Sequence, residues 1–353
     1  HRPRHLGSDE SVLSAFREDV DLALGRLLSV TPEVLDSLCG TPAFVQGPMA
    51  MISTNTAFAS AMTDEGIFPV FAFTGLQGPA LDELAQRVCS ADGVGDYGVG
   101  IAGRMDLSPS DALARFSTRP PAVLLLSGDS WGQRDAWRQA GSMETWLHVQ
   151  HTSMLEQGWN EGFRHFVLEG CESGGHVGLL PSSVLWPLVL NASTQLDGER
   201  HELHCVLAGG IHDAESVLFG LLTASAYGFS GRLSFMMGTR LLLTEEATAT
   251  GALHAAYQEV LCRADATRVV GKQSLGVRAA VSGEDSVPAD SELAAVYDSY
   301  GRALKGETGE LCLAGECVGQ CDKPMPLGDL VQLLAGYGRY WSVRREKAAA
   351  CIE

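Results

Sequence analysis

The chain has 353 residues, of which 45% are hydrophobic and 19% charged, and this composition excludes a disordered or fibrous protein. Its 43 acidic and 25 basic residues give a formal net charge of −18, which disfavours binding to nucleic acid or to an anionic membrane surface. The sequence shows no apolar run of the roughly 18 residues that span a bilayer, and no signal-peptide pattern. We therefore expect a cytoplasmic protein. The opening residues lack Met, which favours a piece cut from a longer polypeptide or a processed start.

The nine cysteines are an odd number scattered along the chain, which indicates reduced, intracellular thiols. Cys312, Cys317 and Cys321 form a cluster, but their spacing lacks the CxxC pair of common zinc sites and has no fourth ligand nearby. We therefore expect no metal site there.

In chain order, residues 1–40 are predicted to form an N-terminal helical extension, with helices at 12–28 and 32–38. Eight short apolar runs follow, each bounded by Gly, Pro or polar residues, as is typical of strands buried on both faces of a parallel sheet. They cover residues 43–45, 67–73, 97–101, 122–126, 145–149, 165–168, 204–207 and 233–237. Segments with helical spacing lie between them, including 81–89, 111–116, 134–140, 155–162 and 213–226.

Eight successive strand–helix units predict an α/β protein with a parallel (β/α)8 TIM barrel over residues 41–262. An open doubly wound sheet is the alternative. Residues 263–353 are predicted to be a mixed, largely helical segment that caps the substrate, with helices at 291–304 and 327–340.

Glycines follow the seventh and eighth runs, where this fold usually binds phosphate. Gly209 and Gly210 end one strand, and Met236, Met237, Gly238 and Thr239 end the next. Glycine lets main-chain N–H groups approach a ligand, and a helix N-terminus adds a favourable dipole. The two loops together favour a phosphate-bearing cofactor over two ordinary tight turns.

After the sixth run, Gly174 and Gly175 precede His176, whose imidazole titrates near neutral pH. Because its neighbours have almost no side-chain bulk, we favour a proton-transfer role for His176 over a structural one. For His148, His151 and His212, which also follow strands, a structural hydrogen-bonding role is favoured.

These motifs resemble the nitronate monooxygenase (2-nitropropane dioxygenase) family, which includes FMN-dependent enoyl-acyl-carrier-protein reductases. The similarity runs in order from about residue 41 to 330 and is carried by the motifs QGPM after the first run, ESGGHVG at 172–178, AGGI, MGT and Gly319–Gln320. It is greatest for enoyl-reductase-like members attached to polyketide and polyunsaturated fatty acid synthases.

The resemblance implies FMN, with NADPH or NADH as reductant. It implies that Gly209, Gly210 and the segment from Met236 to Thr239 hold the phosphate. The flavin ring would lie near Gln46, Gly47, Pro48 and Met49, with Glu169, Gly174, Gly175 and Gln320 in contact with the cofactor. His176 would be the active-site histidine.

Two positions separate this chain from many family members. Enoyl reductases have Glu where this chain has Glu169, whereas many nitronate-oxidising members have Gln, so the resemblance favours reduction. Gly100 stands where many members have Asn, so one polar contact to the flavin would be missing.

The resemblance therefore predicts an FMN-dependent enoyl reductase acting on a carrier-bound acyl or polyketide thioester. It further implies an acyl-carrier-protein substrate and a surrounding synthase, and it leaves a homodimer open. The alternatives are a nitronate monooxygenase, or a non-catalytic barrel kept for assembly within a synthase.

Overall fold

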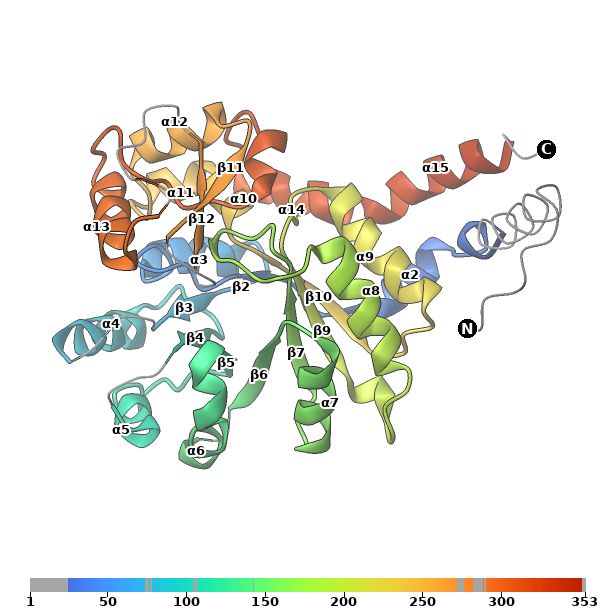
Figure 1. Ribbon diagram of the computed structural model, residues 1–353, viewed down its shortest axis with the longest axis horizontal. Helices are drawn as coiled ribbons and strands as arrows, with labels where there is room; N and C mark the ends of the chain where they lie inside the picture. Colours follow the sequence, from blue (N-terminus) through green and yellow to red (C-terminus); the bar gives the residue numbers. More distant parts are fainter. Residues whose placement is uncertain are drawn as a thin grey trace.

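Every apolar run predicted as a strand forms one, and these strands surround the centre of the molecule (Figure 1). The structure is a computed structural model that describes residues 25–350 apart from 74–75, 77, 104–106, 142, 272–275, 282–287 and 289, and apart from the side chains of Asp129 and His176. The strands are β1 (Cys39–Gln46), β2 (Ile67–Phe68), β3 (Val70–Ala72), β4 (Gly98–Ala102), β5 (Val123–Ser127), β6 (Glu144–Val149), β7 (His165–Glu169), β9 (His204–Ala208) and β10 (Arg232–Met237).

The sheet closes into a barrel at Pro69. Its strand order is β2-β1-β10-β9-β7-β6-β5-β4-β3, and neighbouring strands run parallel. Strands β2 and β3 are parts of one run, separated by Pro69, which has no N–H to give to a ladder. The two ends of the strand order are therefore neighbours in the chain. The predicted (β/α)8 TIM barrel is confirmed, and the open-sheet alternative is wrong.

Helices alternate with the strands and cover the outside of the barrel, as Figure 1 shows. They are α3 (Thr56–Asp64), α4 (Pro79–Ser90), α5 (Pro109–Ala114), α6 (Arg134–Ala140), α7 (Thr152–Asn160), α8 (Ser182–Ser193) and α9 (Ala214–Ala226), followed by α10 (Thr239–Leu242), α11 (Glu245–Ala249) and α12 (Ala255–Arg263). Short polar side chains begin several of them. Asn55, for example, accepts a 2.9 Å hydrogen bond from the N–H of Phe58 at the start of α3.

Alternate residues of the strands point into the barrel, and its middle is apolar. Trp146, Val167 and Val206, from three neighbouring strands, belong to one buried cluster there. Because side chains alternate along a strand, the residues two positions away share this inner face. That places Glu169 at the C-terminal end of β7 and His165 at its N-terminal end. The barrel therefore has two polar ends separated by an apolar layer.

The chain after the barrel forms β11 (Thr267–Val270), β12 (Val277–Ala280), α13 (Leu293–Leu304), the 3-10 turn η4 (Glu316–Gln320), α14 (Leu327–Ala335) and α15 (Tyr337–Ala350). Strand β12 pairs antiparallel with β11 and with β8 (Gly175–His176), which lies in the loop after β7. The sequence did not predict this second sheet. The single helix predicted over residues 327–340 is wrong, because the chain turns at Gly336 between α14 and α15.

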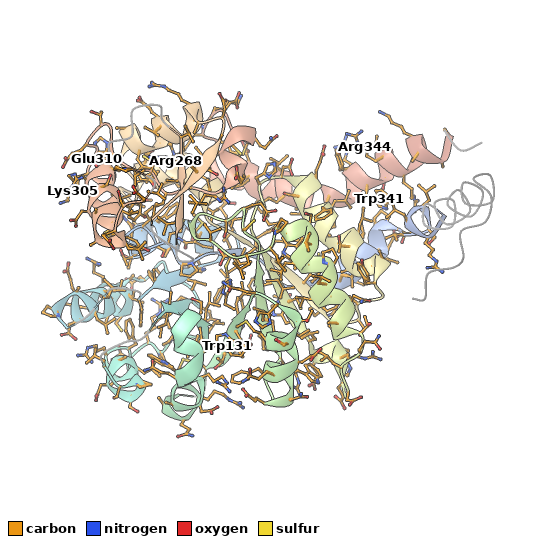
Figure 2. The ribbon with its side chains drawn as sticks, viewed as in Figure 1. Trp131, Arg268, Lys305, Glu310, Trp341 and Arg344 are labelled. Atoms are coloured by element: carbon orange, nitrogen blue, oxygen red, sulfur yellow. The ribbon has the colours of Figure 1, made fainter. Side chains whose placement is uncertain are left out.

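The two ends of the described chain pack together. Helix α15 lies beside α2 (Pro32–Leu38), which was predicted at these bounds (Figure 1). Trp341 of α15, labelled in Figure 2, donates from Nε1 to the carbonyl of Val30 at 2.8 Å. Residues 25–28 are helical, and the rest of the helix predicted at 12–28 lies outside the described residues. Among the described helices, none combines the length and apolar character needed to cross a membrane.

Candidate active site

Most of the predicted site residues come together at the C-terminal ends of four adjacent strands. Gln46 ends β1, Glu169 ends β7, Gly209 follows β9 and Gly238 follows β10, and these strands are neighbours in the order β1-β10-β9-β7. This is the end of the barrel at which enzymes of this fold carry their active sites.

Glu169 is held beside a histidine of the neighbouring strand. Its Oε2 lies 2.9 Å from Nε2 of His148, on the inner face of β6, and the His148 side chain is 11% exposed. Among the described residues, this Nε2 atom has no hydrogen-bond partner of good geometry, so the two side chains are in close contact without a formed hydrogen bond. Trp131, labelled in Figure 2, donates to the carbonyl of His148 at 2.9 Å and fixes that end of β6. A carboxylate and an imidazole therefore face the mouth of the barrel together.

The loop after β7 folds back on itself through Glu172. Both carboxylate oxygens of Glu172 accept from the N–H of Ser182, at 3.0 and 2.9 Å, and the Ser182 hydroxyl donates to Oε2. Glu172 thus caps the N-terminus of α8 from ten residues upstream. The same hydroxyl lies 3.2 Å from the carbonyl of Gly209, which ties this loop to the predicted phosphate loop.

Gly174 packs directly against the chain beyond the barrel. A Cβ at this position would lie 2.8 Å from the carbonyl carbon of Ala314 and 2.9 Å from the nitrogen of Gly315. Gly175 has a φ of 82°, and with His176 it forms β8. The main chain of His176 is paired with Val277 of β12, and its side chain lies outside what the structure describes.

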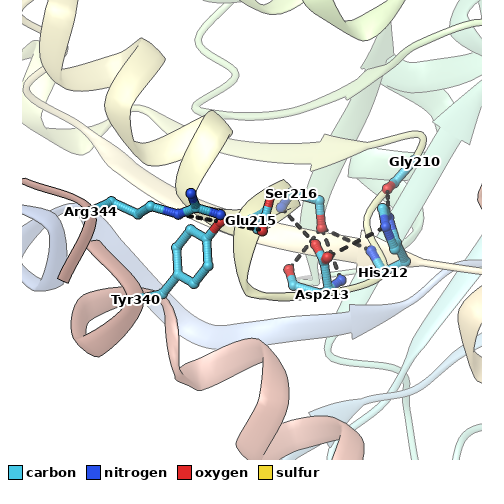
Figure 3. A network of polar contacts seen from close by, with 7 residues as sticks. All are labelled: Gly210, His212, Asp213, Glu215, Ser216, Tyr340 and Arg344. Carbon is cyan, nitrogen blue, oxygen red and sulfur yellow. Dashed lines mark hydrogen bonds and ion pairs between the residues drawn. The ribbon is translucent and has the colours of Figure 1, made fainter. Parts of the chain in front are cut away.

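The glycines after β9 form a turn that other residues could not easily adopt. Gly209 and Gly210 have φ values of 99° and 79°. The carbonyl of Gly210 lies 2.7 Å from Nδ1 of His212, which gives His212 a structural contact as expected. Asp213 caps α9, accepting at 2.8 Å from the N–H of Ser216 (Figure 3). The N-terminus of α9 is therefore occupied by the side chain of Asp213.

The segment after β10 places a buried cation next to the second glycine loop. Arg240 is 4% exposed, and its Nε and Nη1 atoms have no hydrogen-bond partner in the described structure, while Nη2 contacts Sδ of Met325 at 2.8 Å. Burial raises the pKa of the nearby Cys321 thiol, and the Arg240 guanidinium opposes that rise. The Thr239 hydroxyl accepts a 2.7 Å hydrogen bond from the N–H of Gly315. Arg240 lies two residues after Gly238, and no pattern in the sequence indicated that its charge would be buried.

Gln46 and Pro48 lie at the mouth of the barrel. The Gln46 side chain is 1% exposed, and its Nε2 has no hydrogen-bond partner in the described structure. Gly47 donates to the carbonyl of Met237 at 2.7 Å, and Met49 is held by the hydroxyl of Ser53. This loop therefore presents an amide with unused donors beside the ends of β1 and β10.

Gly100 on β4 has a packing role that the sequence could not show. A Cβ at this position would lie 2.5 and 2.6 Å from Cβ and Cγ of Pro48. The Pro48 ring thus occupies the space that an Asn side chain would need. Close packing against Pro48 therefore requires a glycine at this point, and the loss of a polar contact to a flavin stays a prediction.

Two predicted features lie outside this arrangement. Gln320 is exposed at the end of η4, next to Cys321. Among the described residues, no group of potential metal ligands includes Cys312, Cys317 or Cys321, which are buried thiols. Burial raises the pKa of Cys317 to about 12, so its thiol stays protonated.

A groove of about 390 Å³ lies between α9, α14 and α15. Beside it, Arg344 donates to the Tyr340 hydroxyl at 2.9 Å, and both contact Glu215 of α9 (Figure 3). These contacts join α15 to the helix whose cap supports the Gly209–Gly210 turn. The groove carries none of the predicted site residues.

A comparison with known protein families identifies the family of this chain. The nitronate monooxygenase family matches residues 144–335, which is more than half of the chain. The chain belongs to this family. The family consists of flavin-dependent oxidoreductases, so this chain has the fold of a flavin oxidoreductase and the expected resemblance is confirmed.

Two curated relatives are similar over short segments. They are named (3aS,4S,5R,7aS)-5-hydroxy-7a-methyl-1-oxo-octahydro-1H-indene-4-carboxyl-CoA dehydrogenase. The protein of Rhodococcus jostii is 39% identical over 82 residues, 23% of this chain and 19% of the relative. That of Mycobacterium tuberculosis is 34% identical over 91 residues, 26% of this chain and 22% of the relative. The matched part thus spans about a fifth of each relative's length.

Solved structures share the whole barrel. FabK from Thermotoga maritima has a TM-score of 0.68 at 18% identity, covering 90% of this chain and 97% of FabK. Nitroalkane oxidase from Streptomyces ansochromogenes gives 0.64 at 17%, covering 86% and 97%. The enoyl reductase domain of MlnA from the macrolactin biosynthesis cluster of Bacillus amyloliquefaciens gives 0.60 at 11%, covering 87% and 96%. At these identities the likeness shows the fold.

The contact between Gly100 and Pro48 can be tested by adding one methyl group. We expect Gly100→Ala to lower the free energy of unfolding by about 1–3 kcal/mol, because the added Cβ overlaps a rigid ring. Urea denaturation followed by circular dichroism measures this change. Gly301→Ala in α13 is the control, since its Cβ would enter open space and Ala favours a helix. A Gly100→Ala protein as stable as the control would contradict the packing role.

Proposed function

We propose that this protein binds FMN at the C-terminal end of the barrel and reduces the α,β double bond of an acyl thioester with NADPH or NADH. The observation that carries the proposal is the Glu169 carboxylate, which is held 2.9 Å from His148 at the end of β7, next to the strand that the Gly209–Gly210 turn follows. In the family that these motifs resemble, enoyl reductases have Glu at this position and many nitronate-oxidising members have Gln.

The phosphate end of the site has the donors that an anion requires. Gly209, Gly210 and Gly238 present main-chain N–H groups without side-chain bulk, and Arg240 supplies a buried positive charge. Two nitrogen atoms of this buried guanidinium have no hydrogen-bond partner among the described residues, which is costly, and a bound phosphate would compensate that cost. Arg and phosphate also form strong charge-assisted hydrogen bonds. These features support a phosphorylated flavin.

The ring end of the site has matching polar and flat surfaces. The unpaired amide of Gln46 can donate to a ring carbonyl, and the Pro48 ring and the Met49 chain offer apolar surface. Bound FMN would supply the hydride-transfer chemistry that this reduction needs, with NADPH or NADH as the reductant. The protein must then position the thioester, exclude water and deliver a proton to the α-carbon.

His176 is proposed as the proton donor. Its main chain is fixed by pairing with β12, so the position of the residue depends on the segment that follows the barrel. The same segment contacts other loops at the barrel mouth, because the Tyr300 hydroxyl donates to the carbonyl of Ala50 at 2.7 Å. These contacts support the proposal that residues 263–353 cap the substrate.

A thioester substrate is supported by the relatives. Two of them are named as dehydrogenases of a carboxyl-CoA, and the MlnA structure is an enoyl reductase domain. An acyl-carrier-protein-bound substrate within a larger synthase remains part of the proposal. Carrier proteins are usually acidic, so docking would need exposed basic residues; Arg278 does not provide one, because it is 8% exposed and ion-paired with Glu316.

The reaction can be tested without oxygen, using protein saturated with FMN. We expect NADPH or NADH and a crotonyl thioester to be consumed in equal amounts. Glu169→Gln should lower kcat/KM at least about tenfold, because an amide replaces the carboxylate beside His148. Glu156→Gln on the exposed face of α7 is the control and should leave kcat/KM unchanged.

If the thioester is not consumed, the proposed reaction is wrong. Oxygen uptake driven by propionate 3-nitronate, with no need for a pyridine nucleotide, would instead show a nitronate monooxygenase. The nitroalkane oxidase that shares this fold makes that the second function to assay.

The role of Arg240 gives a separate prediction. We expect Arg240→Gln to raise the Kd for FMN about 10- to 100-fold, measured by quenching of flavin fluorescence, because a charged hydrogen-bond donor to the phosphate is lost. Without FMN, the variant should unfold at the same or higher urea concentration, since an unpaired buried charge is removed. Arg263→Gln, at an exposed surface ion pair, is the control. An unchanged Kd would exclude a phosphate role for Arg240.

A further inference from the structure

The N-terminal end of the barrel holds a second group of titratable side chains, far from the proposed flavin site. Glu144 begins β6, His165 begins β7 and His204 begins β9, and these three strands are neighbours. Oε1 of Glu144 lies 2.8 Å from Nδ1 of His165, which lies 3.2 Å from Nδ1 of His204. One potential ligand atom from each residue therefore lies within 4.8 Å of those of the other two.

These separations suit ligands of a single metal ion. Zinc lies about 2.0–2.1 Å from imidazole nitrogen and from carboxylate oxygen, so tetrahedral ligands are about 3.3 Å apart. Two imidazoles and one carboxylate are also the ligand set of many zinc sites that keep a water as fourth ligand. Calcium and magnesium prefer oxygen ligands, which makes them a poor match.

The surroundings orient the ligands. Nε2 of His204 lies 2.8 Å from the Ser234 hydroxyl, which donates its hydrogen to the carbonyl of Pro42. Ser234 must therefore accept from Nε2–H, and Nδ1 of His204 keeps a lone pair that faces His165. Metal-bound histidines are usually held in this way by a partner on the other ring nitrogen. Trp146 donates from Nε1 to Oε1 of Glu144 and holds that carboxylate.

The local packing fixes the imidazole of His204. A Cβ on Gly40 would lie 3.0 Å from both Nε2 of His204 and Oγ of Ser234, so the glycine makes room for this pair. The His165 and Glu144 side chains are 25% and 43% exposed, which leaves the cluster open to solvent on one side.

We propose that Glu144, His165 and His204 bind one divalent transition-metal ion of the zinc type at the N-terminal end of the barrel. The ion links β6, β7 and β9 and leaves one coordination position for water. The site is separated from Glu169 by the apolar layer around Trp146 and Val167. Its expected effect is on the stability of the barrel.

The test uses the full chain, freed of any affinity tag and treated with a chelator. We expect calorimetric titration with Zn²⁺ to show one ion per chain, and Co²⁺ to give the visible bands of a tetrahedral complex. Saturating Zn²⁺ should raise Tm by about 5 °C, because the ion binds the folded state preferentially. No part of this readout depends on flavin or on activity.

Substitutions of the proposed ligands and of a supporting residue test where the ion binds. Glu144→Gln and His165→Gln should each weaken Zn²⁺ binding more than about tenfold, and Ser234→Ala should weaken it about tenfold while keeping all three ligands. His201→Gln is the matched control, because His201 lies in an exposed group with Glu199 and Glu202 and should not affect binding at the barrel. Circular dichroism verifies that each variant is folded.

Two results would overturn the proposal. One is a wild-type protein that binds no Zn²⁺ at micromolar concentration. The other is binding that survives Glu144→Gln and His165→Gln but is lost in His201→Gln. In either case the three residues would form a hydrogen-bonded plug of the barrel.

Discussion

The close approach of two main chains at Gly174 and Gly315 is the constraint on which the proposed active site depends. No Cβ fits at Gly174 beside Ala314 and Gly315, and the same Gly315 donates its N–H to Thr239 after β10. One point of contact therefore positions the loop after β7, the segment after the barrel and the second glycine loop. The position of His176, two residues after Gly174, depends on this junction.

The barrel interior has three levels, in which an apolar middle separates the proposed active site from the polar group at the N-terminal end. Glu169 and His148 lie at the C-terminal level, Trp146 and Val167 belong to the apolar middle, and His165 lies at the N-terminal level. Because enzymes of this fold react at the C-terminal end, polar groups at the other end need another explanation. A metal ion there would stabilise strands without entering the reaction.

The sequence predicted the features that depend on local pattern and missed those that depend on contacts. Strands such as β9 were predicted because they are short apolar runs buried on both faces. The strands β8, β11 and β12 were missed, since two to four residues carry too little periodicity. Position 100 needs a glycine because a Cβ there would overlap Pro48, a contact between segments far apart in the sequence. The burial of the Arg240 charge likewise depends on residues that pack around it in the fold.

The central claim, a flavin held by its phosphate, is tested most directly by comparing FMN with riboflavin. Both share the ring, and only FMN can use the Gly209–Gly210 turn, Gly238 and Arg240. Two or more charge-assisted hydrogen bonds to the phosphate contribute about 1.5–3 kcal/mol each, so we predict that FMN binds at least about 100-fold more tightly than riboflavin. Equal Kd values for FMN and riboflavin, measured by fluorescence titration of the flavin-free protein, would contradict this account.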